Sequence, residues 1–284
     1  MAFDKTINPL VSVIIPTHNR AKYITKALDS VLFQSYQDFE IIIVDDGSTD
    51  NTKSVLESYL KDPRIVYIYQ QNQKVSKARN NGAKRAKGEY IALLDSDDYW
   101  LDSRKLEKQV RFFEENPEYL LTSGGIVRIA ESGQEISKVL NPEADGAIRE
   151  SVLFSCLFTP SGAMFRKSIF EKIGGFNETS DLSEDWEFFL EIGKYGKFYN
   201  FQDYFVAYLQ GSQNRSNFNR RDNLRYNLGL IKKYKTTYLH FPKARAIHFC
   251  YYLYSFLPFG EALLPFFAII KKMVFGKPSY KIIK

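Results

Sequence analysis

Apolar strands alternate with helical segments in the first third of this chain, and this order constrains the fold more than any other feature. Residues 11–15, 40–44, 65–69 and 90–94 are apolar runs, with helical segments at residues 21–34, 50–60 and 75–86. Strands that are apolar on both faces are typical of a parallel sheet covered by helices on each side. The order therefore predicts a doubly wound α/β fold, in which ligands bind beyond the carboxyl ends of the strands.

The middle of the chain mixes helices with shorter strands. Helices are expected at residues 104–115, 167–173, 185–194 and 220–234, and strands at residues 120–129 and 162–165. We find no internal repeat and no low-complexity linker. With 284 residues, of which 44% are hydrophobic, the chain is long enough for one large α/β domain with an appendage or for two small domains.

The basic charge is concentrated at the end of the chain. The chain has 39 Lys and Arg against 33 Asp and Glu, and residues 241–284 contain seven basic residues and one acid. A nucleic-acid-binding protein usually spreads basic charge over a working face, so we expect no nucleic-acid partner. Basic residues beside apolar ones indicate contact with anionic lipid instead.

Residues 246–270 are rich in Phe, Tyr, Leu and Ile, but Pro258, Gly260, Glu261 and Pro265 interrupt them. A membrane-spanning helix needs about 20 predominantly apolar residues. An interfacial helical hairpin is therefore the favoured interpretation, and a true span or a soluble packing or dimer surface are the alternatives. The N-terminus lacks the pattern of a secretory signal. We expect a cytoplasmic protein that binds the inner face of the membrane through residues 246–284.

Acidic residues follow two of the strands. Asp46, in the segment Asp45-Asp46-Gly47-Ser48, is placed to accept hydrogen bonds from a nucleotide base or ribose, although the segment also suits a turn that caps the next helix. The segment Asp95-Ser96-Asp97-Asp98 holds three carboxylates, which repel one another unless a cation lies among them. Hard oxygen ligands suit Mg²⁺ or Mn²⁺. A solvated acidic turn is the alternative.

Two further groups of charged residues have chemical interpretations. One of the acids Glu184 and Asp185 is a candidate general base for an acceptor hydroxyl, against the alternative of an acid cluster favoured by the helix dipole. Trp186 beside them is a candidate acceptor-side residue, although a core anchor is the favoured role. Lys77 and Arg79 are placed to meet a diphosphate, or else belong to a solvated helix face.

In this order, the segments resemble the family 2 glycosyltransferases of the GT-A fold. The motifs that carry the resemblance are VIIPTHNR (13–20), IVDDGSTD (43–50), VSKARNNG (75–82), LDSDD (94–98), GGF (174–176) and ED (184–185). The first four are specific in combination, and the match is weaker up to about residue 210. His18 stands where the family often has Tyr, and Gln73 or Lys74 where it has Gly.

The resemblance implies a Rossmann-like mixed sheet flanked by helices. Positions beyond about residue 215 lie outside the resemblance, and their composition predicts a C-terminal helical extension that is apolar and basic. The catalytic domain is expected over residues 1–215, with its nucleotide-sugar half at about 1–100 and its acceptor half at about 101–215. Residues 216–284 form the extension. A processive synthase would carry a Gln-x-x-Arg-Trp motif and several membrane spans, which we do not find, so a single-addition enzyme is implied.

The resemblance also assigns roles to individual residues. Asp185 matches the acceptor-side catalytic base, and Asp97 matches the ligand of Mn²⁺ or Mg²⁺. The residues expected to hold the donor are Pro16, Thr17, Asn19, Arg20, Asp46, Lys77, Arg79, Asp95, Ser96 and Asp97.

These roles imply an inverting transferase that moves one sugar from a nucleoside-diphosphate sugar, with UDP favoured, to a glycan or lipid-linked glycan in polysaccharide or cell-envelope biosynthesis. Two rival functions are a nucleotidyltransferase and a non-catalytic sugar-nucleotide sensor docked at a membrane. The first usually has a Gly-rich, basic loop after the first strand, where this chain has PTHNR. The second need not keep both Asp97 and Asp185.

Overall fold

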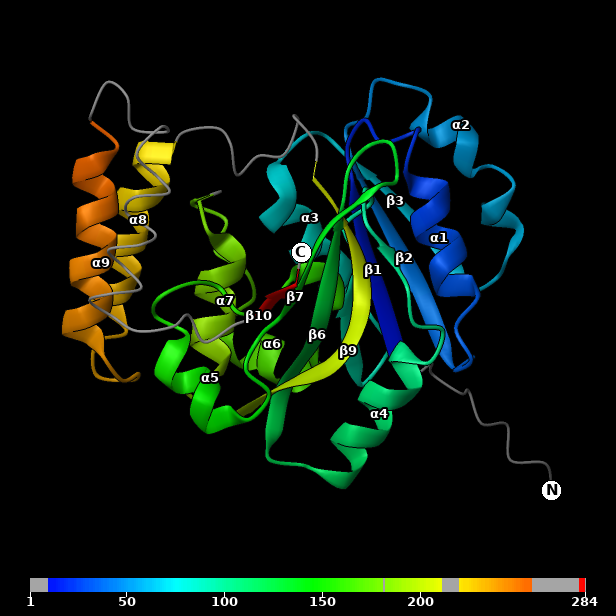
Figure 1. Ribbon diagram of the computed structural model, residues 1–284. Coiled ribbons are helices and arrows are strands. Elements are labelled where there is room, and N and C mark those ends of the chain that lie inside the picture. The colour runs from blue at the N-terminus through cyan, green and yellow to red at the C-terminus, as the bar shows by residue number, and fades with distance from the viewer. Residues whose placement is uncertain (1–9, 181, 211–219, 257–280, 284) are drawn as a thin grey trace.

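The computed structural model describes residues 10–180, 182–210, 220–256 and 281–283. Within these residues one mixed sheet dominates, with the strand order β10-β7-β6-β8-β4-β1-β2-β3 and with β9 paired to β6 and β5 (Figure 1). The strands are β1 Val11–Thr17, β2 Phe39–Asp46, β3 Ile65–Gln70, β4 Tyr90–Leu93, β5 Tyr99–Trp100, β6 Tyr119–Ile129, β7 Glu135–Leu140, β8 Met164–Arg166, β9 Lys197–Leu209 and β10 Lys281–Ile283.

Helices cover both faces of the sheet. The α-helices are α1 Ile24–Leu32, α2 Thr52–Leu56, α3 Lys74–Arg85, α4 Lys105–Glu115, α5 Asp145–Ser151, α6 Lys167–Ile173, α7 Glu184–Ile192, α8 Arg220–Lys233 and α9 Phe241–Tyr254. Two 3₁₀ turns, Tyr59–Lys61 and Pro160–Gly162, complete the described elements. The helix expected over residues 50–60 is divided between α2 and the first of these turns.

The expected doubly wound half is confirmed. Strands β4, β1, β2 and β3 are neighbours in that order and all pair in parallel, with Val11 opposite both Phe39 and Tyr90. Every residue of β1 and β2 is buried, because helices lie on both sides of these strands. Their carboxyl ends therefore meet at one edge of the sheet, where the acidic segments follow β2 and β4.

The second half of the sheet is mixed. Strand β8 runs antiparallel to β4 and β6, while β6 pairs in parallel with the long strand β9. The two-residue strand β5 pairs Tyr99 with Ala207, which fastens the turn after β4 to β9. The sequence pattern did not predict β9, because the polar residues Gln202 and Asp203 interrupt its apolar alternation.

Two hydrophobic cores lie on the two faces of the sheet. One core contains side chains from α1, α2 and α4, and the other contains side chains from α3 and from α5 to α9. In Figure 1, α1 and α2 lie to the right of the strands, α4 lies below them, and α5 to α9 lie to the left. Two deep cores account for the stability of the sheet edge that carries the acidic segments.

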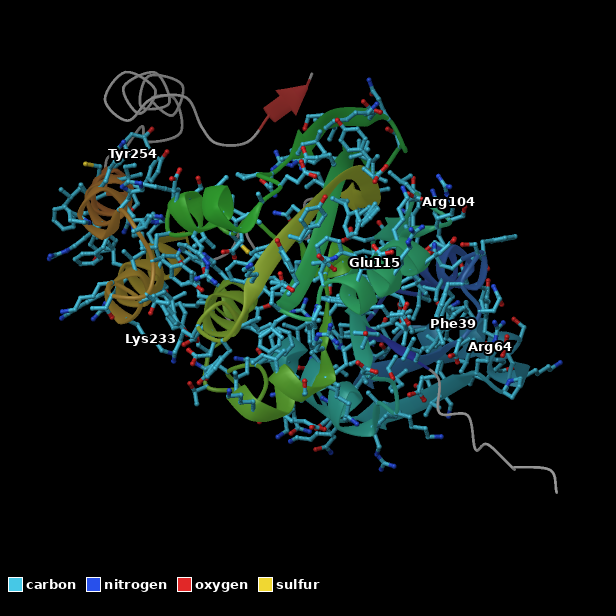
Figure 2. The ribbon with its side chains drawn as sticks, turned by 90° about the horizontal axis from the view of Figure 1, so that it is seen from below. Phe39, Arg64, Arg104, Glu115, Lys233 and Tyr254 are labelled. Carbon is cyan, nitrogen blue, oxygen red and sulfur yellow. The ribbon has the colours of Figure 1, made fainter. Side chains whose placement is uncertain are left out.

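Helices α8 and α9 pack together as a pair at one end of the molecule. In Figure 2, Lys233 of α8 and Tyr254 of α9 lie at the end opposite Phe39 and Arg64. The pair is joined to α7 by hydrogen bonds in which Tyr234 donates to Glu191 at 2.6 Å and Tyr238 donates to the Leu190 carbonyl at 2.6 Å.

The two helices lie within the expected C-terminal extension, and the domain boundary at residue 215 stays a prediction. Helix α9 ends at Tyr254, and most of the apolar run at residues 246–270 lies outside the described residues. Among the described helices, none has the length and apolar character needed to cross a bilayer.

Candidate active site

The acidic turn after β4 is held in place by one buried carboxyl group. Asp98 is 2% exposed and accepts hydrogen bonds from the Ser161 hydroxyl at 2.5 Å and from the Leu209 backbone N–H at 2.9 Å. The Ser161 hydroxyl also accepts a hydrogen bond from the Asp95 backbone N–H at 3.1 Å. Burial, followed by the charges of Asp97 and Asp95, raises the pKa of Asp98 well above its usual range. Asp98 therefore fixes the shape of the turn.

Asp97 points toward the loop after β1. Its Oδ2 lies 3.3 Å from Arg20 Nε, and about a fifth of each side chain is exposed. The contact forms because β1 and β4 are adjacent parallel strands whose carboxyl ends lie together. Burial and then the neighbouring charge of Asp95 raise the pKa of Asp97, while Arg20 opposes this shift. A bound cation would stabilise the ionised form in the same way.

Arg79 joins the acidic turn after β4 to the start of α7. Its side chain is 3% exposed and forms ion pairs with Asp95 at 2.8 Å and with Glu184 at 3.2 Å. Its guanidinium also lies 5.4 Å from the centre of the Phe176 ring. Two protein carboxylates thus engage the buried guanidinium, and Arg79 positions these two acids. The expected contact of Arg79 with the donor stays a prediction.

Glu184 and Asp185 begin α7 and lie close to this cluster. Burial, the charge of Asp185 and the opposing effect of Arg79 together set the pKa of Glu184 at about 7, above its usual value. Burial is also the main reason that the pKa of Asp185 is raised, and Arg79 again opposes the shift. A carboxylate that holds its proton more tightly than usual is a better general base near neutral pH. The two acids interact and titrate as a pair.

Trp186 lies in the core. Its ring is 3% exposed, its indole N–H donates to the Val152 carbonyl at 2.9 Å, and the ring stacks on His248 with centroids 5.6 Å apart. The expected role as a core anchor is confirmed. As an acceptor-side residue, Trp186 has no exposed ring face to offer to a sugar in this structure.

The loops after β1 and β2 are tied together by hydrogen bonds. Asn19, which has a φ of 53°, accepts from the backbone N–H groups of Thr49 at 2.7 Å and Asp50 at 3.2 Å. Asp46 is 3% exposed, and its Oδ1 accepts from Gln70 at 2.7 Å and from the Gln73 backbone at 2.7 Å. Asn19 and Asp46, two of the expected donor-binding residues, therefore also hold these loops in position.

The remaining expected donor-binding residues differ in accessibility. Pro16 is buried, Thr17 is 3% exposed and Ser96 is 5% exposed. The Thr17 hydroxyl is buried without a hydrogen-bond partner in the described protein. Lys77 forms an ion pair with Glu178 at 2.7 Å, with about a third of each side chain exposed. Lys77 can exchange this exposed partner for a phosphate.

Tyr208 belongs to the site although the sequence did not single it out. It follows Ala207, the partner of Tyr99 in the β5–β9 pairing, and so lies beside the acidic turn. Burial, followed by the charges of Asp98, Asp95, Asp97 and Asp185, raises its pKa. Neither Tyr208 nor Ser161 stands in a recognisable motif, so only the pairing of β9 with β5 and the packing of the turn reveal them.

A divalent cation fits the chemistry of this edge. Within the described ranges no three His, Cys, Asp or Glu side chains group as a metal-ligand set. Mg²⁺, however, is commonly held by one or two carboxylates together with substrate phosphates. Acidic groups outnumber basic ones in the cluster, which contains the five acids Asp95, Asp97, Asp98, Glu184 and Asp185 and the two bases Arg20 and Arg79. A bound cation would stabilise the ionised forms of these acids, whose pKa values are raised in its absence, so the excess of acidic groups favours a cation.

Comparison with known proteins gives consistent results. A model of glycosyl transferase family 2 matches residues 12–174. TuaG of Bacillus subtilis, named as a teichuronic acid biosynthesis glycosyltransferase, is 41% identical over 155 residues, which are 52% of this chain and 60% of TuaG. The matched region spans only 23–27% of the length of three Rickettsia glycosyltransferases that are 34–37% identical to it.

Solved structures share the fold. S. aureus TarS in complex with UDP-GlcNAc superposes with a TM-score of 0.62 and 21% identity, over 87% of this chain and 73% of the TarS chain. The mannosyltransferase PcManGT of Pyrobaculum calidifontis, in complex with GDP-Man and Mn²⁺, gives a TM-score of 0.62 and 20% identity, over 95% of this chain and 82% of its own. The expected GT-A glycosyltransferase fold is confirmed.

Proposed function

Because the chain belongs to glycosyl transferase family 2, we propose that it is an inverting glycosyltransferase that transfers one sugar from a nucleoside-diphosphate sugar to a glycan or lipid-linked glycan. The observation that carries the proposal is the convergence of two acidic segments, Asp95–Asp97 and Glu184–Asp185, on the buried guanidinium of Arg79. A metal-dependent transferase needs one set of acids to bind the metal at the donor and another acid to accept the proton of the acceptor hydroxyl.

The donor's nucleoside binds in the loops after β1 and β2. The unpartnered Thr17 hydroxyl and the free Oδ2 of Asp46 are suited to the polar edge of a base or to ribose hydroxyls. Uracil is the favoured base, and thymine offers the same N3–H. TarS carries UDP-GlcNAc and PcManGT carries GDP-Man, so this fold accommodates more than one nucleotide.

The diphosphate lies near the turn after β4, with Lys77 available beside it. Asp97 is the proposed protein ligand of Mn²⁺ or Mg²⁺, with Asp95 close to the ribose. When bound, the cation neutralises charge on the departing diphosphate. PcManGT, which shares the fold, was solved with Mn²⁺. Arg20 and Arg79 hold Asp97 and Asp95 in position before the donor arrives.

Asp185 accepts the proton of the acceptor hydroxyl. The hydroxyl oxygen forms a bond to the anomeric carbon while the bond from that carbon to the diphosphate oxygen breaks, and the electron pair leaves with the diphosphate. Attack from the face opposite the leaving group inverts the anomeric centre, so an α-linked donor gives a β-linked product. The raised pKa of Asp185 suits proton transfer near neutral pH.

The α8–α9 pair carries the proposed membrane contact. Phe249, Leu253 and Phe256 are each about half exposed, on a segment whose residues 221–256 contain seven basic residues and one acid. Exposed aromatic and aliphatic side chains beside basic ones suit the surface of an anionic membrane. Peripheral attachment to the inner face of the cell membrane would bring the enzyme to lipid-linked acceptors used in polysaccharide or cell-envelope biosynthesis.

The test is donor hydrolysis by the purified protein. The protein is incubated with Mn²⁺ and UDP-, dTDP- and GDP-sugars, with and without a lipid-linked glycan fraction, and the free nucleoside diphosphate is measured. Release from one donor class is expected, falling to background in Asp97→Ala and unchanged in the control Asp203→Ala, whose acid is half exposed on β9. Pyrophosphate release instead would indicate a nucleotidyltransferase, and no release under any condition would favour a sensor.

A further inference from the structure

Asp46 is the last member of a chain of side-chain hydrogen bonds that begins on α3. Asn81 Nδ2 donates to Gln70 Oε1 at 2.6 Å, and Gln70 Nε2 donates to Asp46 Oδ1 at 2.7 Å. Gln70 and Asp46 lie side by side because they are register partners in the parallel pair of β2 and β3. Gln70 is 9% exposed and Asp46 is 3% exposed, so each depends on its protein partner rather than on bulk water.

This chain has a fixed direction. An amide oxygen can only accept a hydrogen bond, and an amide NH₂ group can only donate one. Because Asn81 donates to the Gln70 oxygen, the Gln70 NH₂ group is turned toward Asp46. In the opposite orientation, the Gln70 oxygen would face a carboxylate oxygen with no proton between them. Asn81 therefore decides which end of Gln70 Asp46 meets.

A backbone N–H holds the same carboxylate oxygen. The Gln73 N–H donates to Asp46 Oδ1 at 2.7 Å. The close approach of this segment depends on Gly47, which has a φ of 79° and where an added Cβ would lie 2.9 Å from the Asn72 backbone nitrogen. Two donors thus occupy Oδ1, while Oδ2 of Asp46 accepts no hydrogen bond from the residues that the structure describes. Oδ2 is the atom left for a ligand.

We propose that Gln70 and Asn81 are positioning residues that make Asp46 select nucleobases with a ring N–H on the edge that it contacts. The inference rests on the proposed donor site, in which Asp46 meets the base. A carboxylate oxygen that can only accept suits the N3–H of uracil or thymine and the N1–H of guanine. Cytosine N3 and adenine N1 present a lone pair there, which leaves the carboxylate unpaired. The two amides thus influence base selection without touching the base.

Asn81→Asp reverses the chain at its first member. A carboxylate at residue 81 cannot donate, so Gln70 turns its NH₂ group to that residue and its oxygen toward Asp46. Asp46 then loses one of its two donors and is no longer held with Oδ2 free. Gln70→Leu removes the same donor without adding charge. Asn51→Asp is the matched control, because it makes the same substitution at an exposed residue before α2 whose side chain caps no helix N–H.

The dissociation constants of UDP, CDP, GDP and ADP are measured by titration calorimetry with Mn²⁺ present. The wild type should bind UDP at least about tenfold more tightly than CDP, as expected for one hydrogen bond to a charged acceptor, and GDP more tightly than ADP. The UDP-to-CDP preference should fall toward one in Asn81→Asp and Gln70→Leu and persist in Asn51→Asp. A merely structural role would weaken both nucleotides alike and leave their ratio unchanged.

Equal binding of the two nucleotides in each pair by the wild type, or an unchanged preference in either Asn81→Asp or Gln70→Leu, would overturn the proposal. Failure of the wild type to bind any of the four nucleotides would overturn the donor site and this inference with it. Selective nucleotide binding without donor hydrolysis would count against the transferase function alone and would leave the result on base selection standing.

Discussion

Replacing Arg79 with methionine removes the buried guanidinium that joins Asp95 to Glu184. The methionine fills part of the same space, so the main effect is to leave two partly buried carboxyl groups without their ion pairs at 2.8 and 3.2 Å. Breaking a buried ion pair by removing one partner typically costs about 3–5 kcal/mol. We expect a loss of that order in the free energy of unfolding near pH 8.

The loss should shrink at lower pH. Arg79 lowers the pKa of Glu184, which is about 7 even with this partner, so the pKa rises further in Arg79→Met. Near pH 5.5 Glu184 is protonated in both proteins and little of its ion pair exists to be lost. Near pH 8 Glu184 is mostly ionised in the wild type and less so in Arg79→Met, whose Glu184 has the higher pKa. The stability difference between the two proteins therefore increases as the pH rises through about 7.

The measurement is urea denaturation at the two pH values, with Lys77→Met as the matched control. Lys77 lies on the same helix, and its ion pair with Glu178 is about one-third exposed. Removal of an exposed pair costs about 1 kcal/mol or less. If Arg79→Met were no more destabilising than the control, or if its effect were the same at both pH values, the bridging role of Arg79 would be refuted.

Three further outcomes are expected. The kcat/KM of the wild type should rise with pH toward about 7 as the Glu184–Asp185 pair ionises. In Glu184→Gln this rise should occur at lower pH, and an unchanged pH profile would show that the two acids do not titrate as a pair. Gly82→Ala should lower the free energy of unfolding by about 1–3 kcal/mol in urea titrations, because the new Cβ would lie 2.6 Å from Ile14 Cγ2; unchanged stability would mean that α3 can move away from β1. The double variant Phe249→Asp, Leu253→Asp should lose co-sedimentation with phosphatidylglycerol vesicles while donor hydrolysis persists, and retained binding would place the membrane contact elsewhere.

Much of the structure of the first hundred residues could be predicted from the sequence. The four parallel strands and helices α1 and α3 occur where apolar runs and helical spacing indicated them, within a few residues at each end, whereas the helix expected over residues 50–60 is divided between α2 and a 3₁₀ turn. Such patterns are local, because each buried strand must carry its own apolar side chains. The mixed second half of the sheet was harder to predict. Strands β7 and β9 have interrupted patterns, and their place in the sheet depends on pairing with β6.

The sequence by itself determined the family, the doubly wound sheet and the edge at which acidic residues collect, because these follow from local patterns and motif order. Only the tertiary structure decided which charges meet. Arg79 contacts Asp95 and Glu184, which are 16 and 105 residues away in the chain, and these contacts position the two acids. Likewise Ser161 reaches Asp98 across 63 residues. Such pairings depend on how distant elements pack, and no pattern within a single segment specifies them.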